Sequence, residues 1–149
     1  MGLRSFVSEE SLALHREHLA VLRAKKQMCI ENREAKSLAL DIRAHELYFS
    51  SFCKERVLCP RIKEGYHSEN RFCFALTEYA REIQCGYLFI YPIPRFPFVS
   101  FGSDGALLHR AALAVDLWEH AYFLDYGFDR DAYLKAALSH LDFSKLMQF

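Results

Sequence analysis

Apolar residues recur every three to four positions in the first third of the chain, which is the spacing of one face of an α-helix. One such face lies within residues 12–26 and a second within residues 38–52. A polar break near residues 29–33 separates them, and Pro60 and Gly65 mark the end of the second segment. This pattern predicts two antiparallel helices joined by a short turn.

The later part of the chain changes from helical spacing to short apolar runs of strand length. Prolines interrupt one of these runs, which predicts a short or irregular strand there. Helices, then a small three-stranded antiparallel sheet, then helix again predict an α+β fold class. The elements predicted are a helix at 69–84, strands at 86–91, 98–101 and 110–117, and helix from Glu119 onward, clearest over 133–141.

Length and composition indicate one folded domain. At 149 residues with 52% hydrophobic content, the chain can bury one sizeable core and is not a disordered sequence. We divide the domain, residues 1–149, into a helical hairpin half at 1–58 and an α/β half at 59–149. Nineteen basic residues balance nineteen acidic ones, so charge gives no signal for nucleic acid. No apolar run reaches the roughly 18 residues that a membrane span needs.

The cysteines indicate a reducing environment. Their number, five, is odd, and no CxxC pair occurs, so a disulfide framework is not predicted. We therefore expect an intracellular protein of the mitochondrial matrix or the cytoplasm. A zinc site built from Cys53, Cys59 and His67 is a minor alternative, because the spacing of these residues is irregular.

The segment Asp116–Tyr122 carries the clearest chemical signal. Asp116 and His120 offer two metal-ligand side chains four positions apart, and Trp118 and Tyr122 could limit access of water to them. This segment closely resembles the C-terminal metal-binding signature of the iron/manganese superoxide dismutases. The resemblance implies that Asp116 and His120 bind metal and that Glu119 reaches across a dimer interface.

Two further ligands are expected upstream. The segments leading to His15 and around His45 resemble the family's motifs for its first two ligands, although Ala44 and Phe49 depart from the second motif. Independently, each histidine lies about 15 residues, roughly 22 Å, from a turn near Ile30, so the two lie level in an antiparallel hairpin. The resemblance implies one iron or manganese ion per chain, held by His15, His45, Asp116 and His120. Such a donor set would also accept zinc.

Other positions depart from the family. Spacing places Leu19 where the family has a gateway histidine and Phe123 where it has a tyrosine, both near the expected dimer interface with Glu119. Residues 86–115 contain no glutamine, although the family uses one beside the metal-bound solvent. At the alternative glutamine position stands Asp41, which either contacts that solvent or, as we favour, faces bulk water. No catalytic residue is expected beyond the ligands.

Two functions remain open from the sequence. The first is a superoxide dismutase, as a homodimer. The second is a non-catalytic dismutase-fold subunit of a larger assembly, since dismutase-like proteins occur in mitochondrial ribosomes. A third function combines the two: a protein that keeps the metal for folding but has weak catalytic activity. The remaining histidines lack a matching context and are predicted to lie at the surface: His18, His67, His109 and His140.

Overall fold

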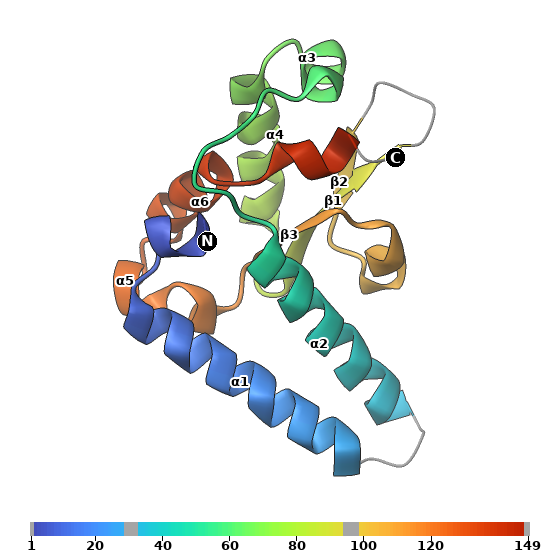
Figure 1. Cartoon of the computed structure of the whole chain (residues 1–149), viewed down its shortest axis with the longest axis vertical. Coiled ribbons are helices and arrows are strands. Elements are labelled where there is room, and N and C mark those ends of the chain that lie inside the picture. Colours follow the sequence, from blue (N-terminus) through green and yellow to red (C-terminus); the bar gives the residue numbers. More distant parts are fainter. Residues whose placement is uncertain (1, 29–32, 94–98, 148–149) are drawn as a thin grey trace.

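Two long helices form an N-terminal hairpin that projects from the rest of the molecule (Figure 1). The computed structural model describes residues 2–28, 33–93 and 99–147. A short 3₁₀ helix, η1 (Gly2–Ser5), precedes α1 (Glu9–Met28), and α2 (Arg33–Ser50) runs back beside α1. The predicted helical pair is confirmed, while the turn near Ile30 lies outside the described residues.

Local chemistry explains where α1 begins and ends. The Ser8 hydroxyl accepts a hydrogen bond from the Ser11 amide at 3.1 Å, as an N-cap residue does. Glu9 lies in the first turn and Lys26 in the last, so both charges complement the helix dipole. The face that α1 buries has the predicted helical spacing and comprises Ser11, Leu12, His15, Leu19 and Leu22.

Two short helices, α3 (Pro60–Tyr66) and α4 (Glu69–Glu82), follow the hairpin. Pro60 was expected to end a helix, but α2 already ends at Ser50 and Pro60 instead begins α3. Proline fits the first turn of a helix because the amide that it lacks has no partner there. The Ser68 hydroxyl caps α4 by accepting from the Arg71 amide at 3.1 Å.

A three-stranded antiparallel sheet with the order β2-β1-β3 lies at the centre of the C-terminal half. β1 (Tyr87–Pro92) is buried along its whole length between β2 (Val99–Gly102) and β3 (Leu113–Asp116). In the register between β1 and β3, Tyr87 is opposite Asp116. This pairing aligns the start of β1 with the end of β3, where the site described below lies.

Several predicted boundaries were wrong in this half. Residues 105–110 form a 3₁₀ helix, η2 (Gly105–Arg110), so the third strand begins three residues later than predicted. The final helical region is also divided. It consists of η3 (Glu119–Ala121), α5 (Phe123–Tyr126), α6 (Arg130–Ser139) and η4 (Phe143–Met147).

Main-chain hydrogen bonds attach the end of α2 to the chain beyond α6. The Cys53 amide donates to the His140 carbonyl and the Asp142 amide donates to the Ser51 carbonyl, both at 2.8 Å. An isolated antiparallel bridge joins Phe52 and Leu141 between them. The hairpin therefore packs as part of the same core as the sheet. That core includes Leu12, Tyr48, Phe72, Leu88 and Tyr133.

None of the described helices is long and apolar enough to cross a membrane. Cys53, Cys59, Cys73 and Cys85 are free thiols, whereas Cys29 lies outside the described residues. The zinc alternative is not supported in the described part of the chain, because no three-residue metal-ligating cluster there includes Cys53, Cys59 or His67.

Candidate metal centre

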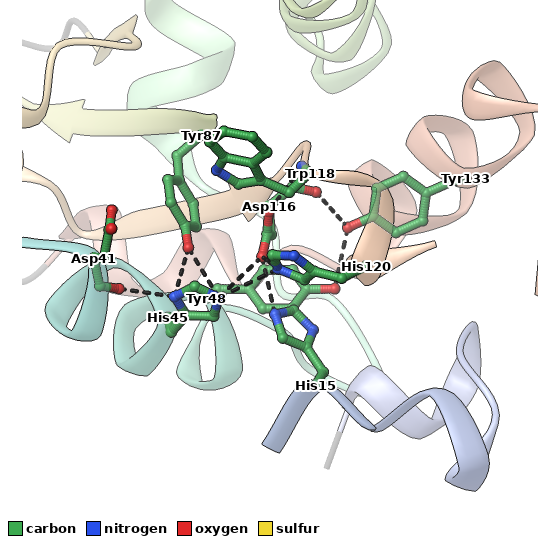
Figure 2. A network of polar contacts seen from close by, with 9 residues as sticks. All are labelled: His15, Asp41, His45, Tyr48, Tyr87, Asp116, Trp118, His120 and Tyr133. Atoms are coloured by element: carbon green, nitrogen blue, oxygen red, sulfur yellow. Dashed lines mark hydrogen bonds and ion pairs between the residues drawn. The ribbon is translucent and has the colours of Figure 1, made fainter. Parts of the chain in front are cut away.

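Asp116 is the centre of a buried polar cluster between the hairpin and the sheet (Figure 2). It ends β3, and its side chain is fully buried. One carboxylate oxygen, Oδ1, accepts a hydrogen bond from the Trp118 amide at 2.9 Å. The main-chain carbonyl of Asp116 accepts another from the Tyr133 hydroxyl at 2.8 Å. These contacts fix the carboxylate so that its second oxygen, Oδ2, faces the histidines.

Three imidazoles surround this second oxygen. His15 comes from α1, His45 from α2, and His120 from η3, four residues after Asp116. The distances from Asp116 Oδ2 are 2.9 Å to His15 Nε2, 3.5 Å to His45 Nε2 and 2.8 Å to His120 Nε2. The ring centroids of His15 and His45 are 5.1 Å apart, which confirms that the two histidines lie level in the hairpin.

Ligand atoms from all four side chains lie within 4.8 Å of one another. One nitrogen of this group lacks a hydrogen-bond partner among the described residues. His15 Nε2 is buried and has no aligned hydrogen-bond partner, despite its closeness to Asp116. The Nε2 atoms of His45 and His120 lie only 3.3 Å apart. A cation among these nitrogens and the carboxylate would satisfy them together, so the donor set fits a metal ion.

The second nitrogen of His45 has partners that orient the ring. His45 Nδ1 lies 2.8 Å from the Asp41 carbonyl and 2.6 Å from the Tyr87 hydroxyl. A proton on Nδ1 donated to the Asp41 carbonyl leaves the lone pair on Nε2, which lies 3.1 Å from the Tyr87 hydroxyl and 3.5 Å from Asp116 Oδ2. Metal-binding histidines are commonly oriented in this way by a carbonyl oxygen.

The electrostatics favour the protonation states that ligands need. Burial lowers the pKa of His45 to about 4, although the Asp116 carboxylate acts in the opposite direction. Burial disfavours the ionised form of Asp116, but contacts with His120 and His15 outweigh it and lower its pKa to about 2. At neutral pH the group therefore contains a carboxylate and a neutral His45, the states in which both side chains bind metals.

Three buried tyrosines, Tyr48, Tyr122 and Tyr133, pack beside the group. The hydroxyl of Tyr48 lies 3.1 Å from that of Tyr133, which in turn donates to the Asp116 carbonyl. The Tyr48 ring packs against His15 with centroids 5.1 Å apart. Tyr122 stacks on Tyr133 at 5.1 Å. The site is thus held by aromatic side chains from α2, α6 and the segment after η3.

Comparison with models of known protein families gives a match over the C-terminal part of the chain. The family model for the iron/manganese superoxide dismutases, C-terminal domain, matches residues 54–149, which is more than half of the chain. The chain belongs to the iron/manganese superoxide dismutase family. A search of the curated proteins returned no match. The matched region contains Asp116 and His120, while His15 and His45 lie before it and join them only through the fold.

The three residues predicted to lie around the four donors, Asp41, Trp118 and Tyr122, differ from one another in burial. Tyr122 is buried, and its ring stacks on that of Tyr133. Trp118 is 42% exposed and contributes its main-chain amide to Asp116. Asp41 contacts His45 through its carbonyl oxygen, and the residue is otherwise exposed. Burial raises the pKa of the Asp41 carboxyl, with the Asp116 charge adding to the effect.

The three residues predicted at a dimer interface differ in their exposure to solvent. Glu119 is exposed and Phe123 is 45% exposed, so both side chains are accessible to a partner. Leu19 is only 5% exposed. It packs with Leu22 and Ile42 in a small apolar cluster between α1 and α2. Leu19 therefore has no exposed surface to offer in this chain.

One histidine near the site was missed by the sequence analysis. His18 was predicted to lie at the surface, but it is half-buried and its ring centroid lies 4.5 Å from that of His120. The family motif gave no reason to select it, because His18 does not fall on the expected gateway position. Its place three residues after His15 was the available signal, since residues three apart share a helix face.

Two of the tyrosines were missed for a different reason. Tyr87 and Tyr133 were assigned only to a strand and a helix in the sequence. Tyr87 is in β1, opposite Asp116 in the register, and this pairing brings its hydroxyl to His45. The other predicted surface histidines are exposed at His67 and His109, whereas His140 is half-buried against Phe6.

Proposed function

We propose that this chain binds one iron or manganese ion through His15, His45, Asp116 and His120 and disproportionates superoxide to dioxygen and hydrogen peroxide. The observation that carries the proposal is the convergence of four ligand atoms within 4.8 Å from both halves of the chain. His15 and His45 lie outside the matched family region, so their position beside Asp116 and His120 supports the proposal independently of the family match.

The bound ion would supply the one-electron chemistry of the reaction. The protein would contribute a negative charge beside the ion and would hold the ligand side chains in a fixed orientation. Asp116, ionised at neutral pH, offsets the positive charge, and the Tyr133 and Trp118 contacts fix its direction. The Asp41 carbonyl orients His45. These outer contacts commonly alter metal affinity by 10- to 100-fold.

Tyr87 is a buried hydroxyl in contact with a proposed ligand. It lies 2.6 Å from His45 Nδ1, and burial together with the charge of Asp116 raises its pKa well above the ordinary value. Tyr87 therefore stays protonated at neutral pH. We assign it a role in orienting His45 by hydrogen bonding, and we assign no proton transfer to it.

We further propose that the protein acts as a homodimer. Exposed apolar side chains lie immediately after the ligand His120, and the rings of Phe123 and Phe128 are 5.4 Å apart. Phe128 is 90% exposed and Leu124 is 51% exposed. A partner that covered these residues would also reach Glu119, which the family resemblance places at a dimer interface.

A structural subunit of a larger assembly is the second candidate. It is favoured by Leu19 at the expected gateway position, where a buried apolar side chain cannot relay protons. The same exposed residues beyond His120 would then contact another protein of the assembly. This candidate needs the fold and does not need turnover.

Dismutase activity per bound metal atom separates the two candidates. The chain would be purified, loaded separately with iron and manganese, and assayed beside Asp116→Asn. Asp131→Asn is a matched control, since Asp131 is an exposed carboxylate paired with Arg81 away from the site. We expect one ion per chain and activity in the wild-type and control proteins, with both lost in Asp116→Asn.

Bound metal without measurable turnover in the wild-type protein would favour the structural candidate. Equal metal content in wild type and Asp116→Asn would show that the four residues are not the ligands. Circular dichroism of each variant would show whether lost binding follows from lost folding.

A further inference from the structure

His18 packs against two of the proposed ligands without being one of the four converging donors. Its ring centroid is 4.5 Å from that of His120 and 5.2 Å from that of His45. The three ligand rings stand 4.6 to 5.4 Å from one another. His18 is therefore as close to these two ligands as the ligands are to each other.

The exposure of the site shows on which side His18 lies. The side chains of His15 and His45 are 3% exposed and that of Asp116 is fully buried, whereas His120 is 29% exposed. Solvent thus reaches the cluster at His120. Because His18 is half-buried and packs most closely on His120, it lies beside the proposed ligand that solvent reaches most.

The imidazole of His18 is available for a further interaction. Its contacts within residues 2–28, 33–93 and 99–147 are with rings and charges, and no hydrogen bond to its nitrogens occurs there. Four protein donors leave an iron or manganese ion at least one position for solvent or an anion.

We propose that His18 donates a hydrogen bond to the small anion that occupies this remaining position. The expected ligand is a compact monoanion of two or three atoms, the class that includes superoxide and azide. The inference rests on the metal binding proposed above. It makes His18 a positioning residue that replaces, from another place on α1, a polar contact that Leu19 cannot provide.

Azide binding to the iron(III)-loaded protein tests this role. Azide bound to iron(III) gives a charge-transfer absorption band, and a titration gives its Kd. The variants are His18→Leu, which removes the donor, and His18→Gln, which retains an N–H group. His109→Leu serves as the matched control, since His109 is exposed and its ring lies 3.2 Å from the nearby Ala106 carbonyl.

We expect His18→Leu to raise the Kd for azide about tenfold, equivalent to about 1.4 kcal/mol, with iron content unchanged. His18→Gln should recover most of the affinity, and His109→Leu should match the wild type. An unchanged or lower Kd in His18→Leu overturns the inference. Loss of iron from His18→Leu alone also overturns it, because His18 would then be a ligand.

Iron content distinguishes this failure from failure of the proposed function. If the wild-type protein takes up no iron, both the proposed metal centre and the proposed anion contact are wrong. A protein that holds one iron per chain, but whose azide affinity does not depend on His18, removes only the anion contact.

Discussion

The hydroxyl groups of Tyr48 and Tyr133 lie 3.1 Å apart in the core, and the Tyr133 hydroxyl donates a hydrogen bond to the Asp116 carbonyl at 2.8 Å. Because Tyr133 donates to that carbonyl, its oxygen accepts the proton of Tyr48. Both tyrosines are completely buried, so neither hydroxyl can exchange its partner for bulk water. The pair therefore links α2 and α6 to the main chain of Asp116, whose carboxylate belongs to the proposed metal centre.

Replacement of Tyr133 by Phe should lower the free energy of unfolding by about 1–3 kcal/mol. The change leaves the Tyr48 hydroxyl buried without its acceptor and removes a donor from the Asp116 carbonyl. Urea unfolding measures the effect. The double variant Tyr48→Phe/Tyr133→Phe should be no less stable than Tyr133→Phe alone, because it no longer buries an unpaired hydroxyl. A double variant as unstable as the sum of the single changes would argue against this coupling.

Ser51 makes a second buried connection, between α2 and β3. Its hydroxyl donates to the Leu47 carbonyl at 2.7 Å and accepts from the Ala114 amide at 2.8 Å. Ser51→Ala should cost about 1–3 kcal/mol of stability, since the Ala114 amide loses its partner. The neighbouring Ser50 also bonds the Leu47 carbonyl, at 2.9 Å, but is exposed. Ser50→Ala is thus the control, and similar losses in both variants would refute the role of the Ala114 contact.

Metal should stabilise the folded chain in a manner that depends on the four ligands. A metal ion present at about 100 times its Kd adds about 2.7 kcal/mol to the free energy of unfolding. We expect manganese to raise the thermal midpoint of the wild-type protein and EDTA to reverse the change. His15→Gln should show neither response, whereas His67→Gln, a change at an exposed histidine, should show both. An equal manganese response in His15→Gln would exclude His15 as a ligand.

Glu119 and Phe123 should govern self-association if the proposed homodimer forms. Glu119→Ala removes a charged hydrogen-bonding group, whose loss typically costs about 1.5–3 kcal/mol, so the dimer Kd should rise at least about tenfold. Sedimentation velocity over a range of concentrations measures this. Leu58→Ala is a suitable control, because Leu58 is 80% exposed and lies before α3, away from His120. A wild-type chain that remains monomeric at all concentrations would contradict the proposal.

The sequence was most informative where spacing alone determines geometry. His15 and His45 were predicted to lie level because two helices with a central turn leave little freedom, and their rings are 5.1 Å apart. Asp116 and His120 were recognised together because their signature is continuous. The α+β class was predicted because hydrophobic period distinguishes helix from strand, whereas the short helices α3 and η2 were not predicted.

The contacts that sequence reasoning missed depend on side chains from distant segments. Tyr87 reaches His45 through a strand register that no local pattern specifies. His18 meets His120 across more than 100 residues of chain. The error at Pro60 was of another kind, because proline is equally suited to end one helix or to begin the next.

The four proposed ligands come in equal number from the two sides of the chain, His15 and His45 from the hairpin and Asp116 and His120 from the end of β3 and from η3. Division of the gene anywhere between His45 and Asp116 would give two products with two donors each, too few for either to retain the ion. The proposed centre therefore needs both sides of the chain folded together. A relative that kept the C-terminal segment but lost the hairpin could conserve Asp116 and His120 and still have no use for iron or manganese.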